Sequence, residues 1–112
     1  MGTASTNSFQ IKISKNNTVG TVHLSEWFGF HTHKQFTEAY SQLLQETILQ
    51  SIAVDLSKIN HMDSSALGML LLLRERAVQA GKSLFLIGPS KYADQVFQLT
   101  DFHALFEIRP AQ

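Results

Sequence analysis

Two short apolar runs on either side of one long helical pattern constrain the fold of this chain more than any other feature. The runs span residues 52–56 and 84–87, and each is too short for a helix, which is typical of strands buried on both faces. Between them, Asp63 can cap the start of a helix that Gly81 ends. Because a strand–helix–strand unit pairs its strands in parallel, the sequence predicts an α/β domain.

The N-terminal part of the chain adds a hairpin and a helix to this unit. Apolar residues alternate over 9–13 and return over 19–24, and Asn16 and Asn17 between them can supply the positive φ of a turn. Thr32 and Gln35 have the spacing of a capping box. They open a helix whose predicted buried face is Phe36, Ala39, Tyr40, Leu43, Leu44 and Ile48.

The C-terminal part completes the order of elements. Ser90 caps a third helix after Gly88 and Pro89, and residues 102–108 form a final turn and an edge strand. The sequence therefore predicts one domain over residues 9–110, in the order ββαβαβα, with helices packed on a mixed central sheet. Residues 1–8 are small and polar and are expected to form a disordered tail.

Composition excludes several classes of function. Nine basic residues balance nine acidic ones, so the chain has no electrostatic footprint for nucleic acid. It contains no cysteine, which excludes disulfides and thiol chemistry. No apolar run approaches the roughly 20 residues of a membrane span, and the sequence is that expected of a cytoplasmic protein.

The start of the central helix is the candidate functional site. Ser64 and Ser65 follow the Asp63 cap and fall within the first turn. A helical wheel centred on Leu67 predicts that Ser65 points outward and that Ser64 turns toward the packed side. On that wheel the buried residues are Ala66, Leu67, Leu70, Leu71, Leu73, Ala77 and Val78, and the exposed ones are Ser65, Gly68, Leu72, Glu75, Arg76 and Gln79.

The sequence gives little support for a catalytic site or a metal site. His31, His33 and His61 have no carboxylate partner in a metal-binding pattern, so no metal or cofactor is expected. The segment MDSSALG lacks the first glycine of a nucleophile elbow, and His61 beside Ser65 would be a lone neighbour without the acid of a triad. The sequence thus predicts a protein that is not an enzyme.

Residues 54–68, VDLSKINHMDSSALG, resemble the signature of STAS domains, and specifically of the bacterial anti-sigma factor antagonists. The resemblance continues in GKSLFLIGP at 81–89 and LTDFHALFEI at 99–108, and so covers roughly half of the chain, residues 52–108. Two departures are visible. Ala66 replaces a usual glycine, and residues 27–33 do not resemble the family's glycine-containing loop.

The resemblance implies a phosphorylation switch. By motif position Ser65 is the phosphorylated serine, the partner is a serine kinase that also acts as an anti-sigma factor, and a PP2C-type phosphatase restores the hydroxyl. The unphosphorylated form would bind the kinase and the phosphorylated form would release it. The residues expected to contact the partner are Asp63, Ser64, Ser65, Gly68, Met69, Leu72 and Arg76.

Two other functions remain open at this point. One is an accessory subunit of a lipid or anion transporter, which would use the same helix face for a permanent contact and would not need phosphorylation. The other is a sensor that binds a nucleotide or lipid at the rim of the sheet, near Asp55, Ser57 and Asp63, which are placed at the carboxyl end of a strand.

Overall fold

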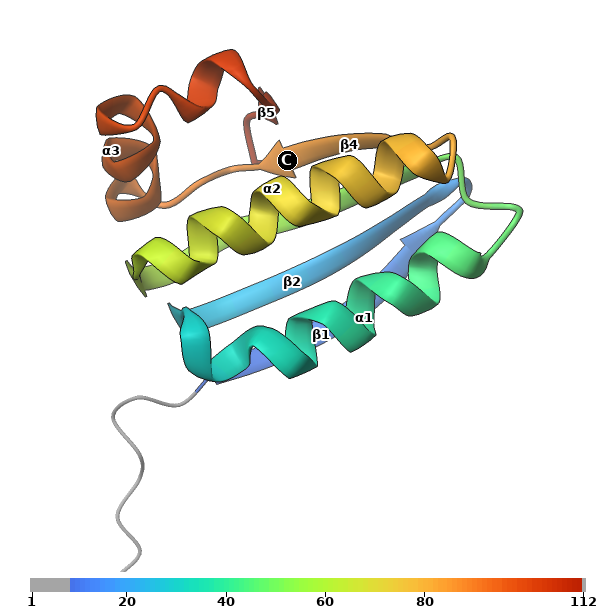
Figure 1. The fold of residues 1–112 in the computed structure, drawn as a ribbon, viewed down its shortest axis with the longest axis horizontal. Helices are drawn as coiled ribbons and strands as arrows, with labels where there is room; N and C mark the ends of the chain where they lie inside the picture. The colour runs from blue at the N-terminus through green and yellow to red at the C-terminus, as the bar shows by residue number, and fades with distance from the viewer. Residues whose placement is uncertain (1–8, 112) are drawn as a thin grey trace, which may run out of the picture.

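The computed structural model describes residues 9–111 and arranges them around one five-stranded sheet (Figure 1). The strands are β1 (Phe9–Asn16), β2 (Val19–Phe28), β3 (Ser51–Met62), β4 (Ser83–Ile87) and β5 (Glu107–Arg109), and the helices are α1 (His33–Gln45), α2 (Ser64–Gln79) and α3 (Lys91–Leu99). Short 3-10 turns precede α1 and β5. The sheet order is β1-β2-β3-β4-β5, with β1 antiparallel to β2 and all other neighbours parallel.

This arrangement confirms the predicted α/β fold, its mixed sheet and its element order, and β5 is the edge strand expected after the third helix. Asn17 has a φ of 55° between the paired residues Asn16 and Val19, as predicted for the hairpin turn. The expected tail at residues 1–8 lies outside the described residues. No helix in residues 9–111 is long and apolar enough to span a membrane.

β2 and β3 are longer than the sequence indicated. They continue side by side as far as the pair Phe28 and Met62, with two irregularities in the register. Polar residues such as Ser57, Lys58 and Asn60 resemble a loop in the sequence, yet the parallel ladder holds them in β3. Pairing between distant segments therefore overrides the local pattern.

α1 begins where predicted, but its capping box does not form. The Thr32 hydroxyl bonds within the preceding turn instead, where it accepts from the backbone N–H of Gly29 at 3.2 Å and donates to the Gly29 carbonyl at 2.7 Å. Phe36, Ala39, Tyr40 and Leu43 are buried, as expected. Ile48 lies beyond the end of the helix and is 68% exposed.

α1 and α2 lie on the same face of the sheet and bury its inner side chains (Figure 1). The core between these layers includes Val22, Leu24, Ile52, Val54, Leu70, Leu73 and Leu86. The other face is partly open to solvent, and Asp55 and Ile87 are only half-buried there. The expectation that β3 and β4 are buried on both faces is therefore wrong for this part of the sheet.

Candidate functional site

The Asp63 carboxylate joins the start of α2 to the segment between β2 and α1. Its Oδ1 accepts from the backbone N–H of Ala66 at 3.1 Å, which is the predicted N-cap. Its Oδ2 accepts from the backbone N–H of Phe30, also at 3.1 Å. One side chain thus fixes two segments that are 33 residues apart in the sequence.

Gly29 allows the Asp63 carboxylate to join these two segments, a contact that we call the Asp63 junction. A Cβ atom at this position would lie 2.6 Å from Cγ of Asp63, far inside van der Waals contact. Neither Gly29 nor Phe30 was predicted from the sequence to be part of the site. The one sequence signal was a glycine between Phe28 and Phe30, because a glycine can mark a place where another group comes close to the backbone.

The two serines differ from the prediction in their exposure. Ser64 is the exposed one, and Ser65 is half-buried. The predicted outward projection of Ser65, with Ser64 turned toward the packed side, is therefore wrong. Ser65 nevertheless stays partly accessible in the first helical turn, where backbone N–H groups have no acceptor within the helix.

The predicted rotation of α2 about its own axis is also wrong for the rest of the helix. The residues that face the core are Ala66, Met69, Leu70, Leu73 and Ala77. Leu71 and Val78 were predicted to be buried but are 38% and 72% exposed, and Leu67 is only half-buried. Met69 was expected on the partner surface but is 5% exposed, so it belongs to the core.

The outward stripe of α2 consists of Ser64, Gly68, Leu71 and Glu75, which are all exposed and recur at helical spacing. Leu72 is half-buried beside this stripe, and Arg76 is exposed, as predicted. Gly68 has open space around it, with no atom within 4 Å of a built Cβ. Leucine and glycine on this stripe leave an accessible apolar strip next to the serines.

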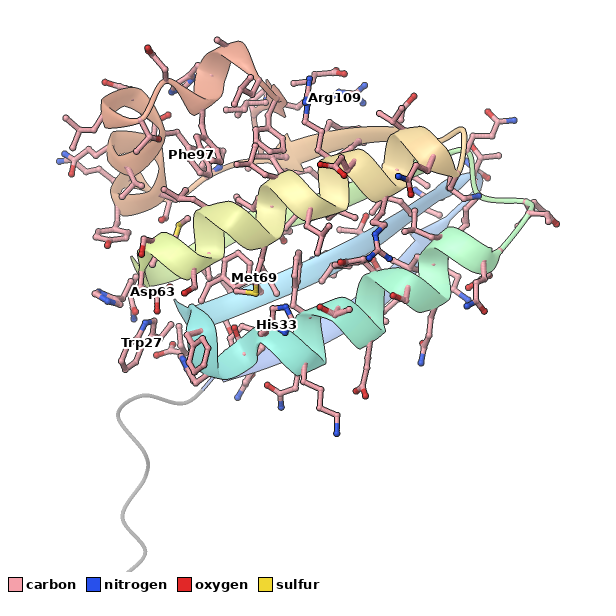
Figure 2. The ribbon with its side chains drawn as sticks, viewed as in Figure 1. Trp27, His33, Asp63, Met69, Phe97 and Arg109 are labelled. Atoms are coloured by element: carbon pink, nitrogen blue, oxygen red, sulfur yellow. The ribbon has the colours of Figure 1, made fainter. Side chains whose placement is uncertain are left out.

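Aromatic side chains from residues 27–33 extend the surface beyond α2. Trp27 lies between His31 and His61, at ring-centroid distances of 4.7 and 5.0 Å, and Phe30 is 76% exposed. Figure 2 shows Trp27 and Asp63 at the same end of the molecule. His61 is thus packed against Trp27, and among the described residues no hydrogen bond joins it to Ser65.

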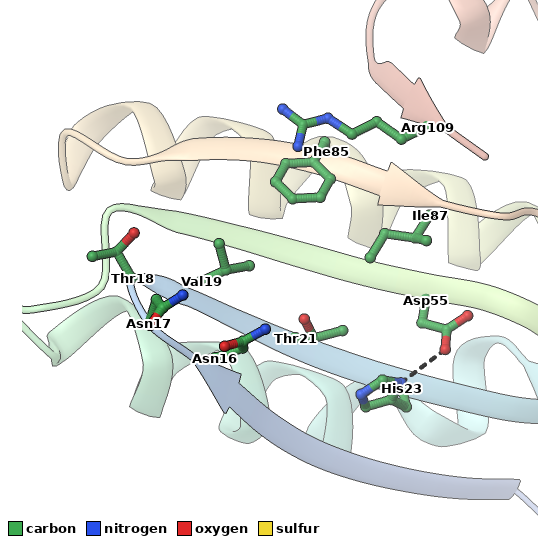
Figure 3. A pocket seen from close by; sticks show the side chains of 10 residues that line it. All are labelled: Asn16, Asn17, Thr18, Val19, Thr21, His23, Asp55, Phe85, Ile87 and Arg109. Carbon is green, nitrogen blue, oxygen red and sulfur yellow. Dashed lines mark hydrogen bonds and ion pairs between the residues drawn. The ribbon is translucent and has the colours of Figure 1, made fainter. Parts of the chain in front are cut away.

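Asp55 and Ser57 do not join Asp63 at one rim, as the sequence suggested. β3 continues to Met62, so Asp55 lies within the strand, eight residues and roughly 25 Å of extended chain from Asp63. Its carboxylate instead points to the open face of the sheet, where it pairs with His23 (Figure 3). Within residues 9–111 no three His, Cys, Asp or Glu side chains are grouped to hold a metal ion.

Sequence similarity defines the class of protein to which this chain belongs. The model of the STAS domain family matches residues 10–111. The chain is also 33% identical over 88 residues to a STAS-domain containing protein of Pseudomonas aeruginosa (strain UCBPP-PA14), a match covering 79% of this chain and 85% of that protein. The chain belongs to the STAS domain family.

Solved structures show the same fold. The unphosphorylated form of the anti-sigma factor antagonist SpoIIAA superposes with a TM-score of 0.75 at 19% sequence identity, covering 94% of this chain and 89% of that one. The phosphorylated form of SpoIIAA, described as a Bacillus cell fate determinant, gives a TM-score of 0.70 at 19% identity, with coverages of 94% and 92%. The fold expected from the resemblance is thereby confirmed.

Proposed function

We propose that this protein is a phosphorylation-switched interaction module of the anti-sigma factor antagonist type, and that Ser65 is the residue modified. The unphosphorylated protein binds a serine kinase that doubles as an anti-sigma factor, and so acts on transcription. Phosphorylation of Ser65 releases the kinase, and a PP2C-type phosphatase restores the hydroxyl. In this proposal the protein acts in the cytoplasm by binding, without catalysis at the serine site, nucleic-acid contact or cofactor.

The observation that carries this proposal is the position of Ser65 in the first turn of α2, partly exposed beside the Asp63 cap. A phosphate there adds about −1.5 to −2 charges and three acceptor oxygens. The helix N-terminus tolerates that charge, because its dipole and free N–H groups favour anions. We therefore infer that the fold survives phosphorylation while the surface chemistry changes.

The proposed partner surface is the outward stripe of α2 with its flanks and the neighbouring loop. It consists of Phe30, Asp63, Ser64, Ser65, Gly68, Leu71, Leu72 and Arg76. Phe30 and Leu71 are exposed apolar side chains of this surface, which suits anchors in a desolvated contact. A phosphate on Ser65 would place uncompensated charge in that contact.

Phosphorylation in vitro tests whether Ser65 is the modified residue. The wild-type protein, Ser64→Ala and Ser65→Ala are each incubated with ATP and the serine kinases encoded in the source genome, and the modified residue is mapped by mass spectrometry. We expect one phosphate per chain, on Ser65, and we expect Ser64→Ala to be labelled and Ser65→Ala to remain unlabelled. The comparison matters because Ser64 is the more exposed serine.

Label on Ser64 in the wild type, or undiminished labelling of Ser65→Ala, contradicts the assignment to Ser65. If no kinase modifies either serine and a partner binds all three proteins equally, the contact is permanent. That result favours an accessory subunit of a transporter over a switch.

A further inference from the structure

Three side chains form a continuous hydrogen-bonded chain on the open face of the sheet, away from α2. Ser14 Oγ lies 2.7 Å from His23 Nε2, and His23 Nδ1 lies 2.8 Å from Asp55 Oδ2. The residues come from three adjacent strands, β1, β2 and β3. In a Ser-His-Asp catalytic triad, the serine hydroxyl likewise bonds to Nε2 of the histidine and the carboxylate to Nδ1.

The charge state of Asp55 fixes the role of Nδ1 of His23. Burial raises the pKa of Asp55, but hydrogen bonds from the Ser57 backbone N–H and from His23 outweigh it, and the pKa lies below its usual value. The carboxylate is therefore ionised at neutral pH and accepts the proton of Nδ1–H. When the ring carries no second proton, Nε2 is the acceptor for the Ser14 hydroxyl, as in a general base.

A hollow of about 490 Å³ adjoins this chain and is lined by both His23 and Asp55 (Figure 3). Its apolar lining comes from Val19, Phe85 and Ile87. Asn16 also lines the hollow and stands two residues after Ser14 on the same strand, so both side chains lie on the same face. Its amide N–H groups are of the kind that stabilise a developing oxyanion.

We propose that Ser14 is a nucleophile that takes an acyl group from a carboxylic ester small enough for the hollow. Ser14 Oγ attacks the carbonyl carbon, and its proton passes to His23 Nε2. The bond between the carbonyl carbon and the leaving oxygen breaks, and His23 returns the proton to the departing alcohol. The product is an ester of Ser14, and the step needs no other reactant. It is a self-modification on the face opposite α2, independent of the proposed switch.

An acylation assay tests this inference with p-nitrophenyl acetate as the probe. Release of p-nitrophenol is followed over time, and the acetylated residue is mapped on the intact protein and its peptides by mass spectrometry. We expect one acetyl group on Ser14, cleaved by hydroxylamine as an ester. Replacing the base in His23→Gln should slow its formation roughly 100-fold or more, and Asp55→Asn should slow it as well.

Ser14→Ala should abolish the ester, whereas His31→Gln is a matched control that should leave it unchanged. The circular dichroism spectrum and the melting temperature of each variant show whether it is folded. Acetylation confined to lysines overturns the inference. So does an ester on Ser14 that forms equally fast in folded His23→Gln, because the imidazole would then have no part in the reaction.

Discussion

Among single residues, the position of the Asp63 carboxylate depends most on Gly29. The carboxylate of Asp63 reaches both Ala66 and Phe30 only because Gly29 has no side chain. Gly29→Ala would push the carboxylate out of place and strain the turn. We expect a loss of roughly 2 to 3 kcal/mol in the free energy of unfolding, from overpacking and a lost helix cap, measured by urea denaturation.

Gly68→Ala is the matched control for this prediction. Its added Cβ meets no atom within 4 Å, and the residue lies inside α2. The substitution should raise stability by roughly 0.5 to 1 kcal/mol, because alanine is the better helix former. A Gly29→Ala protein as stable as the wild type would show that the Asp63 junction contributes little to folding.

At the scale of elements, α2 shows which part of a helix can be predicted from its sequence. Its existence, its Asp63 cap and its end near Gly81 follow from local signals, and all are observed. Its rotation does not follow, because residues 69–73 are a methionine and four leucines that occupy every direction of the wheel. Only packing against the sheet and α1 decides that Leu70 is buried and Leu71 is exposed.

Adjacent leucines provide the test of this rotation. Leu70→Ala should cost roughly 2 to 5 kcal/mol of stability, because it removes a fully buried side chain and leaves a cavity. Leu71→Ala, at a position 38% exposed, should cost less than about 1 kcal/mol. Thermal denaturation of both variants compares the two costs. Equal costs, or a larger cost at Leu71, would favour the wheel centred on Leu67.

At the scale of the whole molecule, periodicity was sufficient to predict the order of elements and the mixed sheet. The junction of Phe30 with Asp63 and the chain from Ser14 to Asp55 could not be predicted, since each depends on strand register between distant segments. The result is a domain with two distinct surfaces. One contains the serines at the start of α2, and the other is the open face of the sheet (Figures 1 and 3).

In the proposed switch, a phosphate on Ser65 alters binding and leaves the fold intact. The most direct test is to measure the Kd of the kinase for the unphosphorylated and the Ser65-phosphorylated protein by calorimetry, together with both melting temperatures. We predict a Kd at least about tenfold higher after phosphorylation, or about 1.4 kcal/mol, with melting temperatures within about 3 °C of each other. Equal Kd values, or a weaker complex accompanied by unfolding, would contradict the account.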